Sequence, residues 1–222
     1  MSKAAVIAGS SGLVGVELLH QLCASKSYHH ITLLVRRPSG FIHPKVEEVI
    51  TDFDHLENIA GRVRGDVFFS CLGSTRKKTP DKKRYYQIDH DYPLAMARMA
   101  LANGMQQFHL ISAVGAATTS SNFYLKMKGE TERDIAALPL PAIHIYRPSF
   151  LAGKREEQRI MEKIGLAVFK IINPLLLGRL RKYRSIDVKD VAKTMIRQSL
   201  KELSGVHYYE SDEMQALSKE PL

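Results

Sequence analysis

The sequence has no long apolar run free of charge and very few cysteines. No stretch offers the roughly 20 uncharged apolar residues that a membrane-spanning helix needs. The five apolar residues before Gly9 are too few for a secretory signal. The two cysteines, Cys23 and Cys71, lie among apolar neighbours and are expected to be buried thiols. Together these features predict a cytoplasmic protein without a transmembrane segment.

The chain also lacks linkers, internal repeats and low-complexity tracts. Its 222 residues suit one domain, which at this size buries roughly 70% of its unfolded surface. We therefore expect a single domain over residues 1–222. We expect a monomer or a homodimer.

Metal-ligand spacing is missing as well. The nine histidines are scattered, and none forms a ligand pair with a cysteine or an acid at the usual spacing. His109 and His144 fall in apolar, strand-like patterns, which indicates hydrogen-bonded core or strand-end residues. We expect no metal ion.

Apolar runs typical of strands alternate with segments of helical periodicity. Strands are predicted at 4–8, 31–35, 46–50, 66–72, 107–112 and 142–147, and helices at 13–24, 90–103, 123–137, 156–172 and 187–200. This alternation predicts an α/β fold with one doubly wound parallel sheet and helices on both faces.

A glycine-rich turn connects the first strand to the first helix. It reads Gly9-Ser10-Ser11-Gly12-Leu13-Val14-Gly15, with Ser11 in the place of a glycine in the commoner pattern. In this context such a turn is typical of dinucleotide binding. Gly9 would permit the tight turn, Gly12 would let a pyrophosphate approach, and Gly15 would let helix and strand pack closely. The alternative is a glycine-bearing turn without a ligand.

The second strand ends in Arg36 and Arg37, where an NAD-binding fold usually carries an acid. Guanidinium groups match a 2′-phosphate bidentately, whereas a carboxylate would repel it. The sequence therefore favours NADP(H) over NAD. The alternative is that both arginines are merely solvated.

Three residues in the second half of the chain suggest proton transfer. Tyr124 and Lys128 are four residues apart, which places them on one face of a helix. A nearby ammonium stabilises a phenolate and makes the phenol a better general acid. Ser112, at the end of a separate strand, could hold a substrate carbonyl beside them. Lys126 is offset by two residues and falls on the other side of the helix.

The net charge of +9 is densest in the basic segment 76–84, which is followed by Tyr85 and Tyr86. Basic residues interleaved with aromatics can bind single-stranded nucleic acid by stacking. The segment also follows a turn where a doubly wound fold binds its ligand. A solvated loop, a contact to the cofactor or to an anionic substrate, and nucleic acid stay open, with nucleic acid the least favoured.

The stretch from Ile160 to Leu180 is unusually apolar. A membrane-surface helix is one interpretation. The favoured one is that residues 150–185 form a small C-terminal part that covers the substrate pocket.

Several motifs give the chain a family resemblance over nearly its full length. They are the glycine turn with Leu34-Val35-Arg36-Arg37, then 70–76, 88–92, 110–113, 121–130 and 146–151. The chain resembles the short-chain dehydrogenase/reductase superfamily, in its atypical branch related to the Tat-interacting-protein oxidoreductases. The resemblance implies a Rossmann fold.

In that superfamily Ser, Tyr and Lys act as a catalytic unit, and this role carries onto Ser112, Tyr124 and Lys128. The resemblance implies cofactor contacts by Gly9, Ser11, Gly12, Leu13, Val14, Gly15, Arg36, Arg37, Asp52, Phe53, Cys71, Leu72, Gly73, Tyr124, Lys128, Arg147, Pro148 and Phe150. Asp52 and Phe53 match the pair that contacts the adenine. Cys71-Leu72-Gly73 depart from the Asn-Asn-Ala-Gly turn of larger branches, which leaves the route of the proton relay open.

These features predict an NADPH-dependent oxidoreductase acting on a carbonyl or an alcohol, with a small-molecule substrate that the sequence does not identify. One alternative is nucleotide-sugar epimerisation, which uses the same three residues with tightly held NAD. The other is a protein that senses NADPH without turnover, which the presence of both Tyr124 and Lys128 disfavours.

Overall fold

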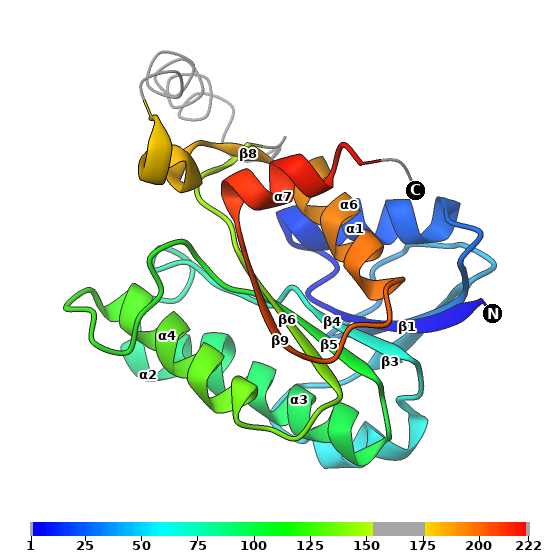
Figure 1. Cartoon of the computed structure of the whole chain (residues 1–222). Coiled ribbons are helices and arrows are strands. Elements are labelled where there is room, and N and C mark those ends of the chain that lie inside the picture. The colour runs from blue at the N-terminus through cyan, green and yellow to red at the C-terminus, as the bar shows by residue number, and fades with distance from the viewer. Residues whose placement is uncertain (1, 153–175, 221–222) are drawn as a thin grey trace.

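A parallel sheet of seven strands forms the centre of the molecule, described here by a computed structural model over residues 2–152 and 176–220 (Figure 1). The strand order is β3-β2-β1-β4-β5-β6-β9, and every neighbouring pair is parallel. The strands are β1 (Lys3–Ala8), β2 (Tyr28–Val35), β3 (Val46–Ile50), β4 (Val67–Ser70), β5 (Gln107–Ile111), β6 (Ala142–Arg147) and β9 (Gly205–Glu210). The predicted doubly wound α/β fold is confirmed.

Helices cover both faces of the sheet (Figure 1). One layer holds α1 (Leu13–Ala24), α6 (Val188–Ser199) and α7 (Ser211–Leu217), and the other holds α2 (Lys82–Tyr86), α3 (Tyr92–Ala102) and α4 (Phe123–Ala136). Alternate residues of β1 supply the two cores: Ile7 packs with α1 and α6, and Val6 packs with α3. Central strands are therefore apolar on both faces, which is why they read as continuous apolar runs.

The predicted strands and helices in the described residues all exist, with ends shifted by at most three residues. The predicted helix at 156–172 lies outside the described residues. Of the proposed covering part 150–185, the described residues form β7 (Leu151–Ala152) and a 3₁₀ helix at Gly178–Tyr183. β7 pairs with β8 (Ile186–Asp187).

Sequence analysis missed β9, α7 and α2. Val206 and Tyr208 of β9 are 38% and 42% exposed while Tyr209 is buried, so this edge strand lacks the apolar run of a central strand. α2 and α7 have only five and seven residues, too few to produce a helical periodicity.

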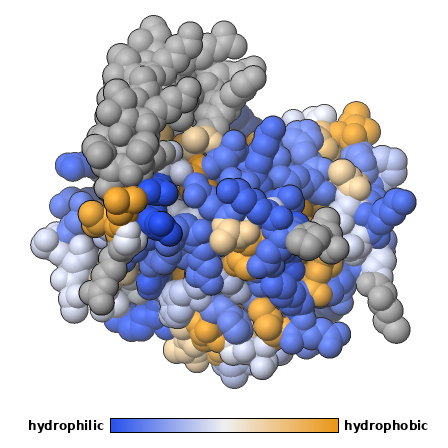
Figure 2. Space-filling model, turned by 45° about the horizontal axis from the view of Figure 1, so that its top comes forward, coloured by the Kyte–Doolittle hydropathy of each residue, from blue (hydrophilic) through white to orange (hydrophobic). Residues whose placement is uncertain are grey.

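The described surface is largely hydrophilic with scattered apolar groups on the face drawn in Figure 2. Among the described residues no helix is long and apolar enough to cross a bilayer. In the same residues no group of three or more His, Cys, Asp or Glu side chains could hold a metal ion.

Buried histidines and tyrosines form a ladder across β5, β6 and β9. The rings of His109 and His144 stack at 4.4 Å, and those of His144 and His207 at 5.2 Å. His109 Nδ1 lies 3.0 Å from the Tyr146 hydroxyl, and His144 Nδ1 lies 2.9 Å from that of Tyr209. His109 Nε2 also lies 3.1 Å from Gln107 Oε1, so both nitrogens of His109 and one of His144 have partners within the sheet.

Burial of the His144 ring, with the nearby positive charges of His207 and Lys3, lowers its pKa to about 4. In the unfolded chain His144 becomes protonated below about pH 6.5, whereas in the folded chain it becomes protonated only below about pH 4. The folded state is therefore destabilised as pH falls through this window. Across the whole window this difference lowers the free energy of unfolding by about 3 kcal/mol.

His144→Gln should remove this acid sensitivity while keeping a polar partner for Tyr209. Between pH 7 and pH 4.5 the unmodified protein should lose about 2 kcal/mol more unfolding free energy than the variant. Urea unfolding at both pH values measures the difference. Equal losses in the two proteins would contradict this assignment.

Candidate functional site

Two glycines hold the turn between β1 and α1 in its shape. Gly9 has a left-handed φ of 83°, and a Cβ there would lie 2.6 Å from the carbonyl carbon of Cys71. A Cβ on Gly15 would lie 2.1 Å from the Gly9 carbonyl oxygen. Both positions therefore require glycine for the backbone to pass, and the turn lies against the chain that follows β4.

Gly12 differs, because nothing in the fold closes around it. It is the N-cap of α1 with extended backbone, and a Cβ there would meet only the Gly9 oxygen, at 3.3 Å, and the Cys71 oxygen, at 3.8 Å. No side chain caps α1. The bare α-carbon and the uncapped N–H groups of Ser11, Leu13 and Val14 are what an approaching diphosphate requires.

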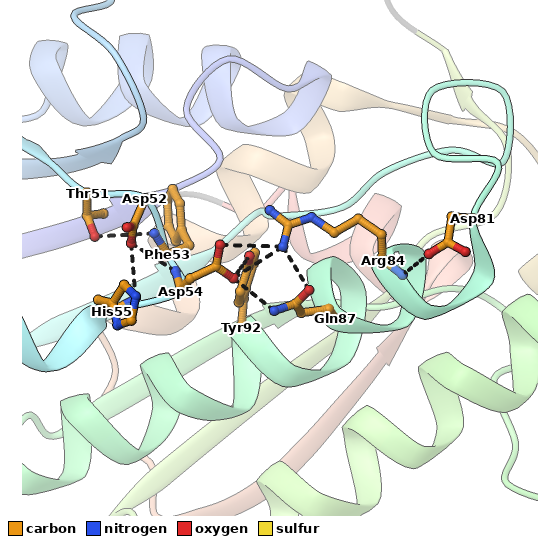
Figure 3. A network of polar contacts seen from close by, with 9 residues as sticks. All are labelled: Thr51, Asp52, Phe53, Asp54, His55, Asp81, Arg84, Gln87 and Tyr92. Carbon is orange, nitrogen blue, oxygen red and sulfur yellow. Dashed lines mark hydrogen bonds and ion pairs between the residues drawn. The ribbon is translucent and has the colours of Figure 1, made fainter.

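The ends of β2 and β3 lie at the same edge of the sheet. Arg36 and Arg37 follow β2 and are exposed. After β3, Phe53 has a φ of 66°, and its ring is 5% exposed and packs 5.8 Å from that of Tyr92. The Asp52 carboxylate accepts from the N–H groups of Asp54 and His55 at 3.0 Å (Figure 3). The predicted adenine contacts are thus fixed in one loop conformation.

Cys71, Leu72 and Gly73 follow β4 beside the glycine turn. The Cys71 N–H donates to the Ala8 carbonyl at 2.9 Å, and Gly73 is exposed. Together with the ends of β1, β2 and β3, this places the predicted cofactor residues of the first half of the chain along one sheet edge.

Tyr124 and Lys128 lie on one face of α4, as their spacing predicts. The Lys128 ammonium is 6.0 Å from the centre of the Tyr124 ring and 3.5 Å from the Ile111 carbonyl oxygen at the end of β5. Lys128 is 3% exposed, whereas Lys126 is exposed to solvent. The pair is therefore set against the end of β5, next to β4 in the sheet.

Ser112 is directed elsewhere. Its hydroxyl donates to Glu132 Oε1 at 2.5 Å, and the serine is 4% exposed. Glu132 in turn accepts from Arg147 Nε at 3.0 Å. The structure thus joins Ser112 to a Glu132–Arg147 ion pair, one turn beyond Lys128 on α4.

Three predicted cofactor residues, Arg147, Pro148 and Phe150, lie at and after the end of β6. Arg147 also reaches Glu210 at 3.5 Å and lies 4.6 Å from the centre of the Tyr208 ring. Pro148 is buried, and Phe150 is 40% exposed. The Arg147 guanidinium therefore links α4 to β9.

Sequence analysis missed Asp89, which the structure places at the centre of the site. Asp89 is 1% exposed in a π-helical turn, Gln87–Asp91. One carboxylate oxygen lies 3.0 Å from Lys128 Nζ, and the other accepts from the Ser74 N–H at 2.7 Å. Burial disfavours the charge on Lys128, but Asp89 and then Tyr124 outweigh it and raise the lysine pKa. Its one sequence signal is its place in the motif at 88–92, which does not by itself indicate a buried ion pair.

The basic segment 76–84 leads into α2, which packs against the Tyr124 region. Tyr85 is 6% exposed, and its ring stacks on that of Tyr124 at 6.3 Å. The Tyr86 hydroxyl donates to Glu130 at 3.1 Å. Since the Tyr85 ring is already stacked within the protein, it does not offer a platform for nucleic-acid bases.

Comparison with known proteins identifies the family. A model of the "NAD dependent epimerase/dehydratase family" matches residues 5–214. The chain is 35% identical to Protein HTATIP2 of Rattus norvegicus over 172 residues, covering 76% of this chain and 71% of that protein. It is 30% identical to "Protein FMP52, mitochondrial" of Coccidioides immitis over 212 residues, covering 90% and 86%.

The fold is also found in a solved structure of the enzyme WbmH of Bordetella bronchiseptica in complex with NAD+. The TM-score is 0.71 at 15% identity, with 98% of this chain and 80% of WbmH covered. At this identity the likeness concerns the fold alone.

The expected cytoplasmic location is wrong by this comparison. FMP52 relatives from several fungi are named as mitochondrial proteins. Composition and the lack of a spanning helix do not specify a compartment, so the expectation rested on features that cannot distinguish these locations.

The family match, the relatives and the glycine turn at the end of β1 agree with one another. The chain belongs to the NAD dependent epimerase/dehydratase family, as an atypical member of the short-chain dehydrogenase/reductase superfamily with an NAD(P)-binding Rossmann fold.

Proposed function

We propose that the protein is an NADP(H)-dependent oxidoreductase that reduces a carbonyl compound or oxidises the corresponding alcohol. The observation that carries the proposal is the Tyr124–Lys128 pair on α4, with its lysine held by Asp89 beside the turn after β4. A sensor without turnover would not need a phenol and a buried ammonium on one helix face.

The residues present fit a nicotinamide dinucleotide. The open side of Gly12 and the first turn of α1 suit the diphosphate, and Arg36 and Arg37 suit a 2′-phosphate. Lys128 would hold the nicotinamide ribose. The bound cofactor supplies or accepts the hydride.

The protein's own residues would manage the proton. Tyr124 would donate its hydroxyl proton to the carbonyl oxygen as the hydride arrives, and would take it back in the reverse direction. Lys128 would stabilise the phenolate left behind, and Asp89 keeps this buried lysine charged. Ser112 would hold the substrate oxygen only when its hydroxyl leaves Glu132.

Nucleotide-sugar epimerisation is the second candidate, because the matching family model is named for epimerases and dehydratases. It requires tightly retained NAD. Arg36 and Arg37 stand at the end of β2, where an NAD-binding fold usually carries an acid, so they favour NADP(H) and weigh against epimerisation.

Replacing both Arg36 and Arg37 with Ala should remove most of the preference for NADPH over NADH. Each charge-assisted contact to the 2′-phosphate is worth roughly 1.5–3 kcal/mol, or about tenfold or more in affinity. Calorimetric titration with both cofactors measures the preference. Arg62→Ala, an exposed arginine outside the site, is the control and should change neither affinity. Equal affinities in the unmodified protein would disprove the assignment.

Tyr124→Phe should separate catalysis from binding. The ring still stacks on Tyr85, so NADPH affinity should stay near normal, while carbonyl reduction should fall by about 10²–10⁴-fold. The rates are measured in a screen of carbonyl compounds in which the oxidation of NADPH is monitored. Turnover at the unmodified rate in this variant would show that the proton comes from another group.

Asp89→Asn keeps the acceptor for the Ser74 N–H but leaves Lys128 without a counter-charge. Breaking a buried pair in this way costs roughly 3–5 kcal/mol of unfolding free energy. The double variant Asp89→Asn/Lys128→Met should be less destabilised than the sum of the two single variants, as measured by urea unfolding. Strictly additive losses would mean that the two residues do not act as a pair.

A further inference from the structure

Asp54 accepts hydrogen bonds from three residues of the continuous helical run formed by α2, the π-helical turn and α3. Its carboxylate accepts from the Tyr92 hydroxyl, from Gln87 Nε2 at 2.8 Å and from Arg84 Nη1 at 3.2 Å (Figure 3). Asp54 directly follows Asp52 and Phe53, the loop that the cofactor's adenine is expected to contact. The loop after β3 is thereby tied to α2 and to the start of α3.

Arg84 is the part of α2 that makes this connection. Its guanidinium lies 5.4 Å from the centre of the Tyr92 ring and donates to Gln87 Oε1 at 2.7 Å. The Arg84 and Asp54 side chains are 40% and 37% exposed, so their ion pair adds little to stability. The pair instead fixes the position of α2 relative to the loop after β3.

The next residue, Tyr85, faces the proton donor. Its ring stacks on Tyr124 with an angle of 22° between the ring planes and lies 6.1 Å from the Phe123 ring. The Tyr85 hydroxyl donates to the Ser74 carbonyl at 3.4 Å. Consecutive residues of a helix point about 100° apart, so α2 presents Arg84 to one loop and Tyr85 to α4.

α2 has five residues and continues through the π-helical turn Gln87–Asp91 into α3. Asp81 caps it by accepting from the Arg84 N–H at 2.7 Å. Besides this connection to α3, the side chains of α2 anchor it, and the Arg84–Asp54 pair joins it to the loop after β3.

We propose that Arg84 is a positioning residue: by anchoring α2 to Asp54, it fixes the Tyr85 ring on which Tyr124 rests, and so couples the loop after β3 to the proton donor. The proposal rests on the proposed function in that Tyr124 donates the proton. Anchoring α2 would be a structural role for the basic segment 76–84, different from a solvated loop and from nucleic-acid binding.

Arg84→Met tests this role, because methionine keeps an apolar stem over Tyr92 and removes the donors to Asp54. At saturating NADPH, kcat should fall about tenfold while the substrate KM and the NADPH Kd change less than about twofold, since only the orientation of the proton donor is disturbed. Arg84→Lys, which can still reach Asp54 with a charge, should recover most of kcat.

Two controls isolate the pathway. Arg133→Met removes another arginine–aspartate contact, Arg133 to Asp134 at 2.7 Å within α4. Asp134 keeps its contact to His90 at 3.0 Å, so kcat should be unchanged. The double variant Asp54→Asn/Arg84→Met should be no slower than the slower single variant, because both changes break the same anchor.

Hydrogen exchange gives a readout that needs no substrate. In Arg84→Met the amides of residues 123–127 should exchange several-fold faster, together with those of 82–87, whereas α1 should be unchanged. Faster exchange confined to residues 82–87 would overturn the coupling. It would do so even if Tyr124→Phe abolished turnover and thereby supported the proposed function. The coupling would also be wrong if Arg84→Met kept the full kcat. Faster exchange at 123–127 without turnover of any carbonyl compound would support the coupling and count against the proposed function alone.

Discussion

A lysine ammonium with 3% exposure needs an opposite charge nearby, and Asp89 supplies it to Lys128 at 3.0 Å. Three separate segments depend on this pair. Lys128 fixes α4 against the end of β5, while the second carboxylate oxygen of Asp89 holds the Ser74 N–H and with it the turn after β4. A Cβ on Gly73 would lie 3.3 Å from the carboxylate, so the turn passes Asp89 closely. The proton-transfer residues and the cofactor edge are thereby placed relative to each other.

Around that pair the site divides into two polar groups with different tasks. On the cofactor side, Asp54, Arg84 and Tyr92 join the loop after β3 to α2 and α3. On the other side, Ser112, Glu132 and Arg147 join β5, α4 and β6. Tyr124 lies between them, stacked on Tyr85 and near Lys128. Because a buried carboxylate requires hydrogen-bond donors, the Ser112 hydroxyl donates to Glu132.

Local sequence signals predicted most of the fold, but not how the polar side chains of the candidate site pair with one another. Continuous apolar runs and a glycine turn predict β1, α1 and a doubly wound parallel sheet, because these signals depend on burial and backbone conformation. The spacing of Tyr124 and Lys128 predicts their shared helix face. Sequence could not predict the partners of Asp89, Glu132 and Arg84, since each bond joins residues brought together only by the fold. The edge strand β9 was missed because Tyr209 is its one buried residue, so it lacks a continuous apolar run.

The central claim is that NADP(H) lies along the edge formed by the ends of β1 to β4, with its nicotinamide at Tyr124. A crystal structure of the protein with NADP⁺ tests it most directly. The account predicts the diphosphate at Gly12 and the N-terminus of α1, the 2′-phosphate at Arg36 and Arg37, and the nicotinamide ribose bonded to Lys128. A cofactor bound with its 2′-phosphate away from both arginines, or with its nicotinamide out of reach of Tyr124, would contradict it.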